Sequence, residues 1–331
     1  MIVDKRWPIA QTGGGFGISA LMQELMCYLG QNRVFEDASE LLRRMTGLRV
    51  SAKQIERVCH YYGQALEGLQ QREEYKSPLE KELSRQRAQD GSQMYYILAD
   101  GSMVFTREEQ WKEVKLGRIF RGDKRVDRVG MNRNMSTSSQ YVVHLGDHKL
   151  FWDKMDRHIE VIPKTRRIFL CDGASWIWNR IEDSYSESIQ IVDFYHAKER
   201  LSQVAEPVLR DQKKQWLSQQ EERLLANDVE GIVKELHGLA KKYPRHNKDF
   251  KREAAYFSRH TQRMQYGSFR KKGYLIGSGP IESAHRKVIQ QRLKLSGQRW
   301  TKEGLQTIAN LRATYLSGEW GLVEGLINKT V

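Results

Sequence analysis

The spacing of apolar residues predicts helices in the first third of the chain. Apolar positions three and four residues apart predict one helix from Ile18 to Leu29 and a second over 35–45. A third helix begins at Ser51, where Ser51 to Gln54 fits a capping box. The polar outer face of the third helix carries Lys53 and Arg57. Two helices joined by a short turn are compatible with a helix-turn-helix DNA reader, and equally with an ordinary helical bundle.

Beyond residue 92 the pattern becomes that of a sheet. Apolar runs predict five strands, at 94–99, 110–120, 140–145, 167–171 and 188–192. Helical spacing follows the third, fourth and fifth of these runs. Three successive strands followed by alternating helix and strand predict an α/β protein with a mixed sheet flanked by helices.

Residues 210–274 depart from this alternation. They are polar and helical in period, and they contain no strand candidate. Between Lys241 and Lys272 there are eleven Lys or Arg against two acids, with aromatic residues interleaved. A helical hairpin with an aromatic core explains part of this pattern, but the local charge excess favours a nucleic-acid surface. The sequence is predicted to divide into four parts. Residues 1–92 are an N-terminal helical region expected to bind DNA, and 93–209 are the first part of the core. Residues 210–274 are a basic α-helical insertion, and 275–331 are the last part of the core with the C-terminal helices.

The charge balance of the whole chain points to the same class of partner. The 331 residues carry a formal net charge of +14. A well-solvated basic surface is the alternative, but clustered Lys and Arg gain affinity by displacing counterions from phosphates. The odd number of cysteines, three, argues against a disulfide framework and for a reducing compartment. No run of residues is apolar enough for a membrane span, so the expected location is the cytoplasm, at the nucleoid.

Three acids are candidates for chemistry. Asp100 and Asp172 each follow an apolar strand and precede a glycine, and Glu282 opens a helix after the glycine-rich turn at 277–280. Asp-Gly is also the commonest turn pair, so neither aspartate is strong evidence alone. Three carboxylates from separate elements can hold two Mg²⁺ or Mn²⁺ ions for an in-line phosphoryl displacement.

Further residues are candidates for supporting roles. Asp193 and His196 follow the fifth strand; Asp193 is interpreted first as a helix cap and otherwise as a near-site carboxylate. A set of basic residues is expected to contact DNA, and the alternative is that they are solvated surface charges. They are Arg286, Lys287, Arg292, Lys294, Lys271, Lys272, Lys53 and Arg57.

Several blocks of the sequence resemble the DDE transposases of bacterial insertion sequences, in particular the Kra-type group, which is related to the Mutator-like transposases. The resemblance covers roughly residues 20–320 and rests on the blocks at 98–101, 111–115, 172–178, 193–199, 277–283, 292–294, 297–300 and 311–313. It implies an RNase H-like core interrupted by a helical insertion, with Asp100, Asp172 and Glu282 as the catalytic and metal-binding acids. One departure is that the Cys/His pair common after the second acid of Mutator-like enzymes is missing.

The activity that the resemblance implies is Mg²⁺-dependent cleavage at transposon ends, followed by strand transfer into target DNA. Its partners are the terminal inverted repeats and the target duplex, with a homodimer assembled on paired ends. An RNase H-like nuclease or resolvase that does not join DNA is one alternative. A non-catalytic DNA-binding protein derived from a transposase is another, and a glycosidase is disfavoured because it leaves the basic charge unexplained.

Overall fold

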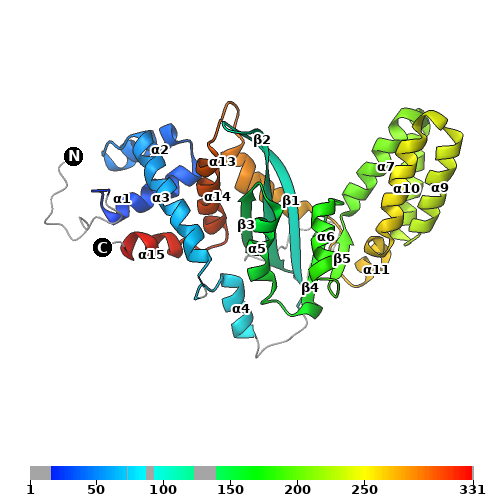
Figure 1. Ribbon diagram of the computed structural model, residues 1–331, viewed down its shortest axis with the longest axis horizontal. Helices are drawn as coiled ribbons and strands as arrows, with labels where there is room; N and C mark the ends of the chain where they lie inside the picture. Colours follow the sequence, from blue (N-terminus) through cyan, green and yellow to red (C-terminus); the bar gives the residue numbers. More distant parts are fainter. Residues whose placement is uncertain (1–15, 73, 87–92, 123–138, 330–331) are drawn as a thin grey trace.

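The computed structural model describes residues 16–72, 74–86, 93–122 and 139–329. A β-sheet lies in the middle of an elongated molecule (Figure 1), with the N-terminal helices at one end. A group of helices from the middle of the sequence projects at the other end and is called the helical arm below.

The sheet has five strands in the order β3-β2-β1-β4-β5. β1 pairs antiparallel with β2, and β2 pairs antiparallel with β3, whereas β4 lies parallel to β1 and β5 parallel to β4. The α/β class with a mixed sheet is therefore confirmed. The strand bounds are β1 (Tyr95–Thr106), β2 (Gln110–Arg121), β3 (Ser139–Leu145), β4 (Arg167–Cys171) and β5 (Ile189–Val192).

The predicted end of the first strand at Ala99 is wrong. β1 continues through Asp100 to Thr106, because β2 pairs with it from Tyr95↔Arg121 to Thr106↔Gln110. An antiparallel neighbour provides hydrogen-bond partners for backbone N–H and C=O groups whatever the side chains are, so the strand continues beyond its apolar run. Asp100 consequently lies in the middle of a strand and not at its end.

Helices cover both faces of the sheet. Gly117 and Arg118 are consecutive in β2 and therefore point to opposite faces. Gly117 faces Met155 and Phe151 of α5 (His148–Ile159), while the Arg118 guanidinium donates to the Pro280 carbonyl. Ring contacts with Phe151 place α6 (Ser175–Ser184) on the α5 face. The opposite face is covered by a continuous helical segment made of α12 (Gly279–Ala284), η7 (His285–Gln290, a π-helical stretch) and α13 (Gln291–Leu293).

The N-terminal helices pack against the C-terminal ones. Gly63 in the third helix approaches the Thr307 backbone so closely that an added Cβ would lie 2.4 Å from its oxygen. The helix of Thr307 also covers the edge strand β3, since Tyr141 N–H donates to Ser317 and Leu145 N–H donates to Gln306. The helices are α1 (Ala20–Asn32), α2 (Phe35–Thr46), α3 (Ala52–Gln70), α4 (Pro78–Gln86), α14 (Lys302–Leu316) and α15 (Gly321–Lys329).

The serine cap of the predicted capping box at the start of α3 is confirmed, because the Ser51 hydroxyl accepts from Gln54 N–H. The polar segment that precedes the sheet is partly buried, since Leu79 and Leu83 of α4 belong to the core. The domain boundary predicted near residue 92 lies outside the described residues.

The helical arm is built on an aromatic core. Phe250, Phe257 and Tyr266 are fully buried, and Tyr243, Tyr256 and Phe269 are packed against the core. The aromatics of this region are therefore packing residues and not a stacking surface, while most of its Lys and Arg residues are exposed. The arm consists of α7 (Phe194–Leu209), α8 (Lys213–Leu225), α9 (Val229–Lys242), α10 (Asn247–Arg259) and α11 (Tyr266–Lys271). Short 3₁₀ turns precede β4 and join the arm helices, at Lys164–Arg166, Arg210–Gln212, Pro244–His246 and Thr261–Met264.

Cys27, Cys59 and Cys171 are all buried and free. Among the described residues, no helix has the length and apolar character that crossing a membrane requires.

Candidate active site

Three aspartates lie level with one another across the parallel strands. β1 and β4 are paired up to Ile97↔Phe169, and three further residues in this register bring Asp100 level with Asp172. β4 and β5 are paired up to Cys171↔Val192, so the next residue pair is Asp172 and Asp193. In sheets of this kind, the carboxyl ends of parallel strands are where sites are built.

The Asp172 carboxyl is largely buried beside another negative charge. Its Oδ1 accepts from Ala174 N–H at 3.0 Å, and its backbone carbonyl accepts from Trp178 Nε1. Burial raises the pKa of Asp172 and the charge of Asp100 raises it further, against the opposing effects of the Ala174 hydrogen bond and His196. A cation between the two carboxylates would relieve both the burial penalty and the repulsion.

Asp100 lies beside His285, which is not among the predicted site residues. His285 Nε2 lies 3.2 Å from Asp100 Oδ2, and the His285 side chain is buried. His285 comes three residues after Glu282, and this spacing places the two side chains on neighbouring positions of one helical face. The spacing is the one signal in the sequence that links His285 to the candidate acids.

Glu282 lies in the first turn of α12, as predicted, and its side chain is exposed. The loop before it is fixed to the end of β5: Ser278 N–H donates to the Asp193 carboxylate, and Phe194 N–H donates to the Ile276 carbonyl. The start of α12 is fixed to β2, where Arg118 Nη1 lies 2.8 Å from the Pro280 carbonyl oxygen. The helix that carries Glu282 is therefore attached to β5, β2 and, through His285, β1.

The structure brings two of the three predicted acids together and leaves the third apart from them. Asp100 and Asp172 lie on adjacent strands, but no group of three or more His, Cys, Asp or Glu side chains in the described residues is arranged to hold a metal ion. The adjacent aspartates fit a divalent cation in their charge and oxygen chemistry. Glu282 is on an anchored helix beside them, with its carboxylate exposed to solvent.

Asp193 caps a helix, as the first interpretation predicted. It is the N-cap of α7, and its Oδ1 accepts from His196 N–H. Its other oxygen accepts from Ser278 N–H, so this buried carboxylate joins the start of α7 to the loop that precedes Glu282. The His196 charge acts on the Asp172 carboxyl and favours its ionised form.

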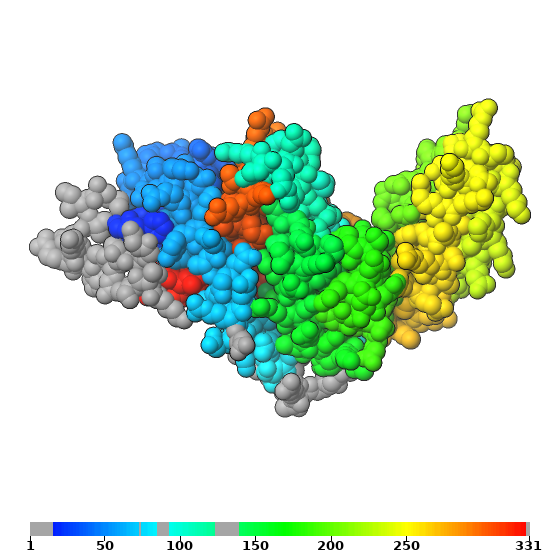
Figure 2. Space-filling view, viewed as in Figure 1, coloured from blue at the N-terminus to red at the C-terminus, as the bar shows by residue number. Residues whose placement is uncertain are grey.

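A basic hollow lies directly beside Asp172. A pocket of about 470 Å³ is lined by Gly173 and Trp178 on the core side and by Arg200, Arg252 and Arg259 on the arm side. Gly173 permits this close approach, because a Cβ at this position would lie 2.4 Å from the Tyr256 ring. Figure 2 shows the surface hollowed where the arm meets the core.

The basic residues predicted to contact DNA fall into two groups. Seven are exposed: Arg286, Lys287, Lys294, Lys271, Lys272, Lys53 and Arg57. The eighth, Arg292, is only 1% exposed, so the alternative that it is a solvated surface charge is wrong.

The comparisons with known proteins give one family. The model of a family described as Uncharacterised protein family (UPF0236) matches residues 30–327. A search of the curated proteins finds no match.

Proposed function

The chain belongs to the UPF0236 family, which is commonly associated with transposases, and from this premise we propose that it is a DDE-type DNA transposase. The observation that carries the proposal is the position of Asp100 and Asp172, which lie level on the adjacent parallel strands β1 and β4. The Glu282 helix contacts β1, because His285 lies against Asp100. The strand order, with an aspartate on the first and another after the fourth strand, supports the RNase H-like core that the sequence resemblance implies.

Asp100 and Asp172 would hold the metal ions, and Glu282, whose carboxylate lies apart from them in this structure, would complete the ligand set when the ions and DNA bind. Bound Mg²⁺ or Mn²⁺ would activate a water or 3′-hydroxyl and stabilise charge on the attacked phosphate. His285 lies against the Asp100 carboxylate, with neither of its ring nitrogens hydrogen-bonded in the described residues. Arg118 fixes the start of the Glu282 helix. Asp193 positions the loop before that helix, so it acts on the site through Ser278 and not on the substrate.

The DNA is held by basic surfaces on both sides of the sheet. On the arm, Lys271 and Lys272 are exposed, and Arg200, Arg252 and Arg259 line the hollow beside Asp172. At the other end, Lys53 and Arg57 lie exposed on α3. Contacts of this kind bind phosphates without regard to sequence. The proposed substrates are the terminal inverted repeats and a target duplex, handled by a homodimer at the nucleoid in the cytoplasm.

The proposal is tested by incubating the full chain with Mg²⁺ and the DNA that flanks its own gene. Transposase activity predicts breaks at the ends of the element and covalent products in which those ends are joined to a second duplex. Both are mapped by sequencing. Breaks without joined products would assign a nuclease or resolvase, and DNA binding without breaks would assign a non-catalytic DNA-binding protein.

Asp172→Asn separates catalysis from binding. Changes to groups that merely support metal ligands cost about 10–100-fold, so loss of a ligand charge should reduce cleavage by more than about 100-fold. DNA affinity should change little, because the arm cations are intact. Loss of cleavage and binding together, with loss of the folded circular dichroism spectrum, would give Asp172 a folding role and contradict the assignment.

A further inference from the structure

A second pocket lies at the opposite end of the Glu282 helix, far from the arm. Its volume is about 500 Å³, and it is enclosed by the starts of α2, α3 and α14 together with the turn between β1 and β2. Four basic and two acidic side chains line it, which leaves an excess of two positive charges: Lys53, Arg107, Arg292 and Arg299 against Glu36 and Glu56.

Arg292 gives this pocket an unusual buried charge. Its guanidinium lies between the rings of Phe35 and Trp300, 4.9 Å from each centroid. Its Nε donates to the Gly30 carbonyl at 3.0 Å, but its Nη2 is buried and has no hydrogen-bond partner among the described residues. No described carboxylate lies within ion-pair distance of it. Burying a cation whose hydrogen-bond donor has no partner costs free energy unless an anion or a water accepts from that donor.

Three helices begin beside this space. Residues in the first turn of α2 (Phe35), α3 (Lys53) and α14 (Gly304) all line the pocket. Side chains cap α3 and α14, whereas the N-cap of α2 is Val34, whose side chain makes no capping hydrogen bond. Backbone N–H groups at an uncapped helix start are suited to phosphate oxygens, against the negative charges of Glu36 and Asp37 in the same turn.

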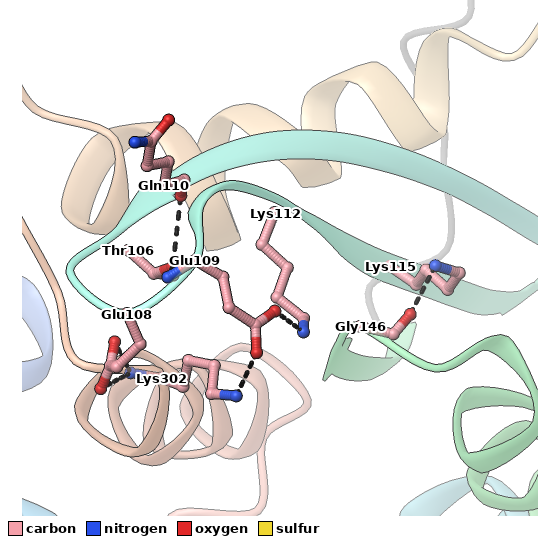
Figure 3. Close-up of polar contacts among 8 residues, drawn as sticks. All are labelled: Thr106, Glu108, Glu109, Gln110, Lys112, Lys115, Gly146 and Lys302. Carbon is pink, nitrogen blue, oxygen red and sulfur yellow. Dashed lines mark hydrogen bonds and ion pairs between the residues drawn. The ribbon is translucent and has the colours of Figure 1, made fainter.

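Of the two acidic residues that line the pocket, Glu56 is paired with Lys53 at 2.7 Å, so this pair adds no net charge. Glu36 makes no ion pair in the described residues, so the positive excess comes from Arg107, Arg292 and Arg299 against this one carboxylate. Figure 3 shows the β1–β2 turn fixed to the start of α14: the backbone N–H of Lys302 donates to Glu108, and the Lys302 ammonium group donates to Glu109. Arg107 Nε donates to the Arg299 carbonyl at 3.1 Å, so the fold positions Arg107 at the pocket.

From this geometry we infer that the pocket around Arg292 binds a backbone phosphate of the DNA. The inference rests on the proposed function for the identity of the ligand, while the phosphate chemistry follows from the pocket alone. Arg292 lies ten residues after Glu282 in a continuous helical segment, a rise of about 15 Å. That distance corresponds to about four base pairs of duplex, so the pocket holds the strand a short way from the candidate metal site.

The first experiment titrates inorganic phosphate into the full chain at constant ionic strength, measured by calorimetry. Wild type should show saturable binding. Arg292→Met should weaken it by about tenfold or more, because it removes a charged hydrogen-bond donor from the pocket. Since Arg292 also packs between two rings, the exposed pair Arg107→Gln/Arg299→Gln provides the variant that keeps the fold, and it should weaken binding about tenfold as well.

Arg33→Gln is the matched control, because Arg33 is exposed and adjacent in sequence to Val34 of the pocket but does not line it. It should leave phosphate affinity unchanged. Absence of saturable phosphate binding by wild type overturns the inference, as does an equal effect of Arg33→Gln and the Arg107/Arg299 double variant.

The second experiment repeats the comparison with a short DNA duplex over a range of salt concentrations. The double variant should weaken DNA binding and lower the salt slope by about one for each lost phosphate contact. Unchanged DNA binding, with phosphate binding lost, overturns the assignment of the phosphate to DNA. Asp172→Asn should bind phosphate like wild type, so failure of the pocket and failure of the catalytic proposal give different results.

Discussion

The basic residues of the helical arm and those of the C-terminal helices have the same chemistry but opposite surroundings. On the arm, Lys241, Lys242 and Arg245 are exposed. In the C-terminal helices, Arg292 and Arg312 are at least 96% buried, and no described carboxylate pairs with either. Burial lowers the pKa of both arginines to about 10.

The buried arginines bind carbonyl groups in place of carboxylates. Arg292 donates to Gly30 and Arg312 donates to Gln31, and both carbonyls belong to the last turn of α1. Carbonyls at a helix C-terminus lack partners within the helix and carry partial negative charge, so they suit a cation. Arg312 also donates to the Val288 carbonyl, and thereby joins α1 to the segment that carries Glu282. Both buried arginines join distant segments of the chain, and Arg292 in addition keeps one donor without a partner in the described residues. The exposed arginines and lysines of the arm have no such structural role.

The sharpest test of this difference is Arg312→Met. The change leaves several carbonyl groups of α1 and η7 without a donor, at a cost of about 1 kcal/mol or more each. We expect the free energy of unfolding to fall by roughly 2–4 kcal/mol, measured by urea denaturation. The same substitution at exposed Arg245 should change it by less than about 0.5 kcal/mol. Equal effects at the two positions would contradict the structural role of burial.

The contrast between buried and exposed groups also predicts how folding stability depends on pH, through the buried His260. Burial lowers the pKa of His260 to about 4, with a smaller contribution from the charges of Arg263 and Arg259. Its pKa in the unfolded chain is about 6.5, so the unfolded state binds the proton first as the pH falls. Stability should therefore be complete above about pH 6.5 and decline towards pH 4, by up to about 1.4 kcal/mol per pH unit for this group.

The measurement is urea denaturation at several pH values. His144 and His158, whose pKa burial also lowers to about 4, add to the same decline. His260→Asn should make the decline shallower, whereas the same change at exposed His148 should leave it as it is. A steeper decline in the His260 variant would show that His260 is stabilised in its charged form.

The smallest effect is expected on the arm. Lys271→Gln/Lys272→Gln removes two exposed charges that make no ion pair in the described residues. Folding stability should be unchanged, while DNA affinity should fall several-fold and the salt slope should decrease by about one to two. Binding measured by fluorescence anisotropy at increasing salt checks this. An unchanged slope would remove these lysines from the DNA surface.

Local pattern was sufficient for most of the elements. The apolar spacing of α3 places Ile55, Val58 and Tyr62 on one side, and all three are buried. The continuous apolar run of β4 is buried along its whole length. These elements follow from periodicity because one face, or both, must leave water. The extension of β1 to Thr106 was missed because its cause is pairing with β2 and not its own composition.

The candidate site is predictable in part. Both aspartates follow apolar runs, which places Asp172 correctly at the end of β4 but not Asp100, which lies in the middle of β1. Their alignment depends on the register between β1 and β4, which are about seventy residues apart in the chain. The sequence spacing links His285 to Glu282, but its position against Asp100 depends on the packing of the Glu282 helix on β1.

By itself, the sequence determined the α/β class, the helical arm, the basic charge and the acids that are candidates for chemistry. Periodicity, caps and composition are properties of short stretches of sequence, so they do not depend on contacts between distant segments. Tertiary structure alone decided which charges are buried. The partner of Arg292 comes from Gly30, 262 residues away, and only that contact turns a residue that looks like surface charge into the buried cation of a pocket.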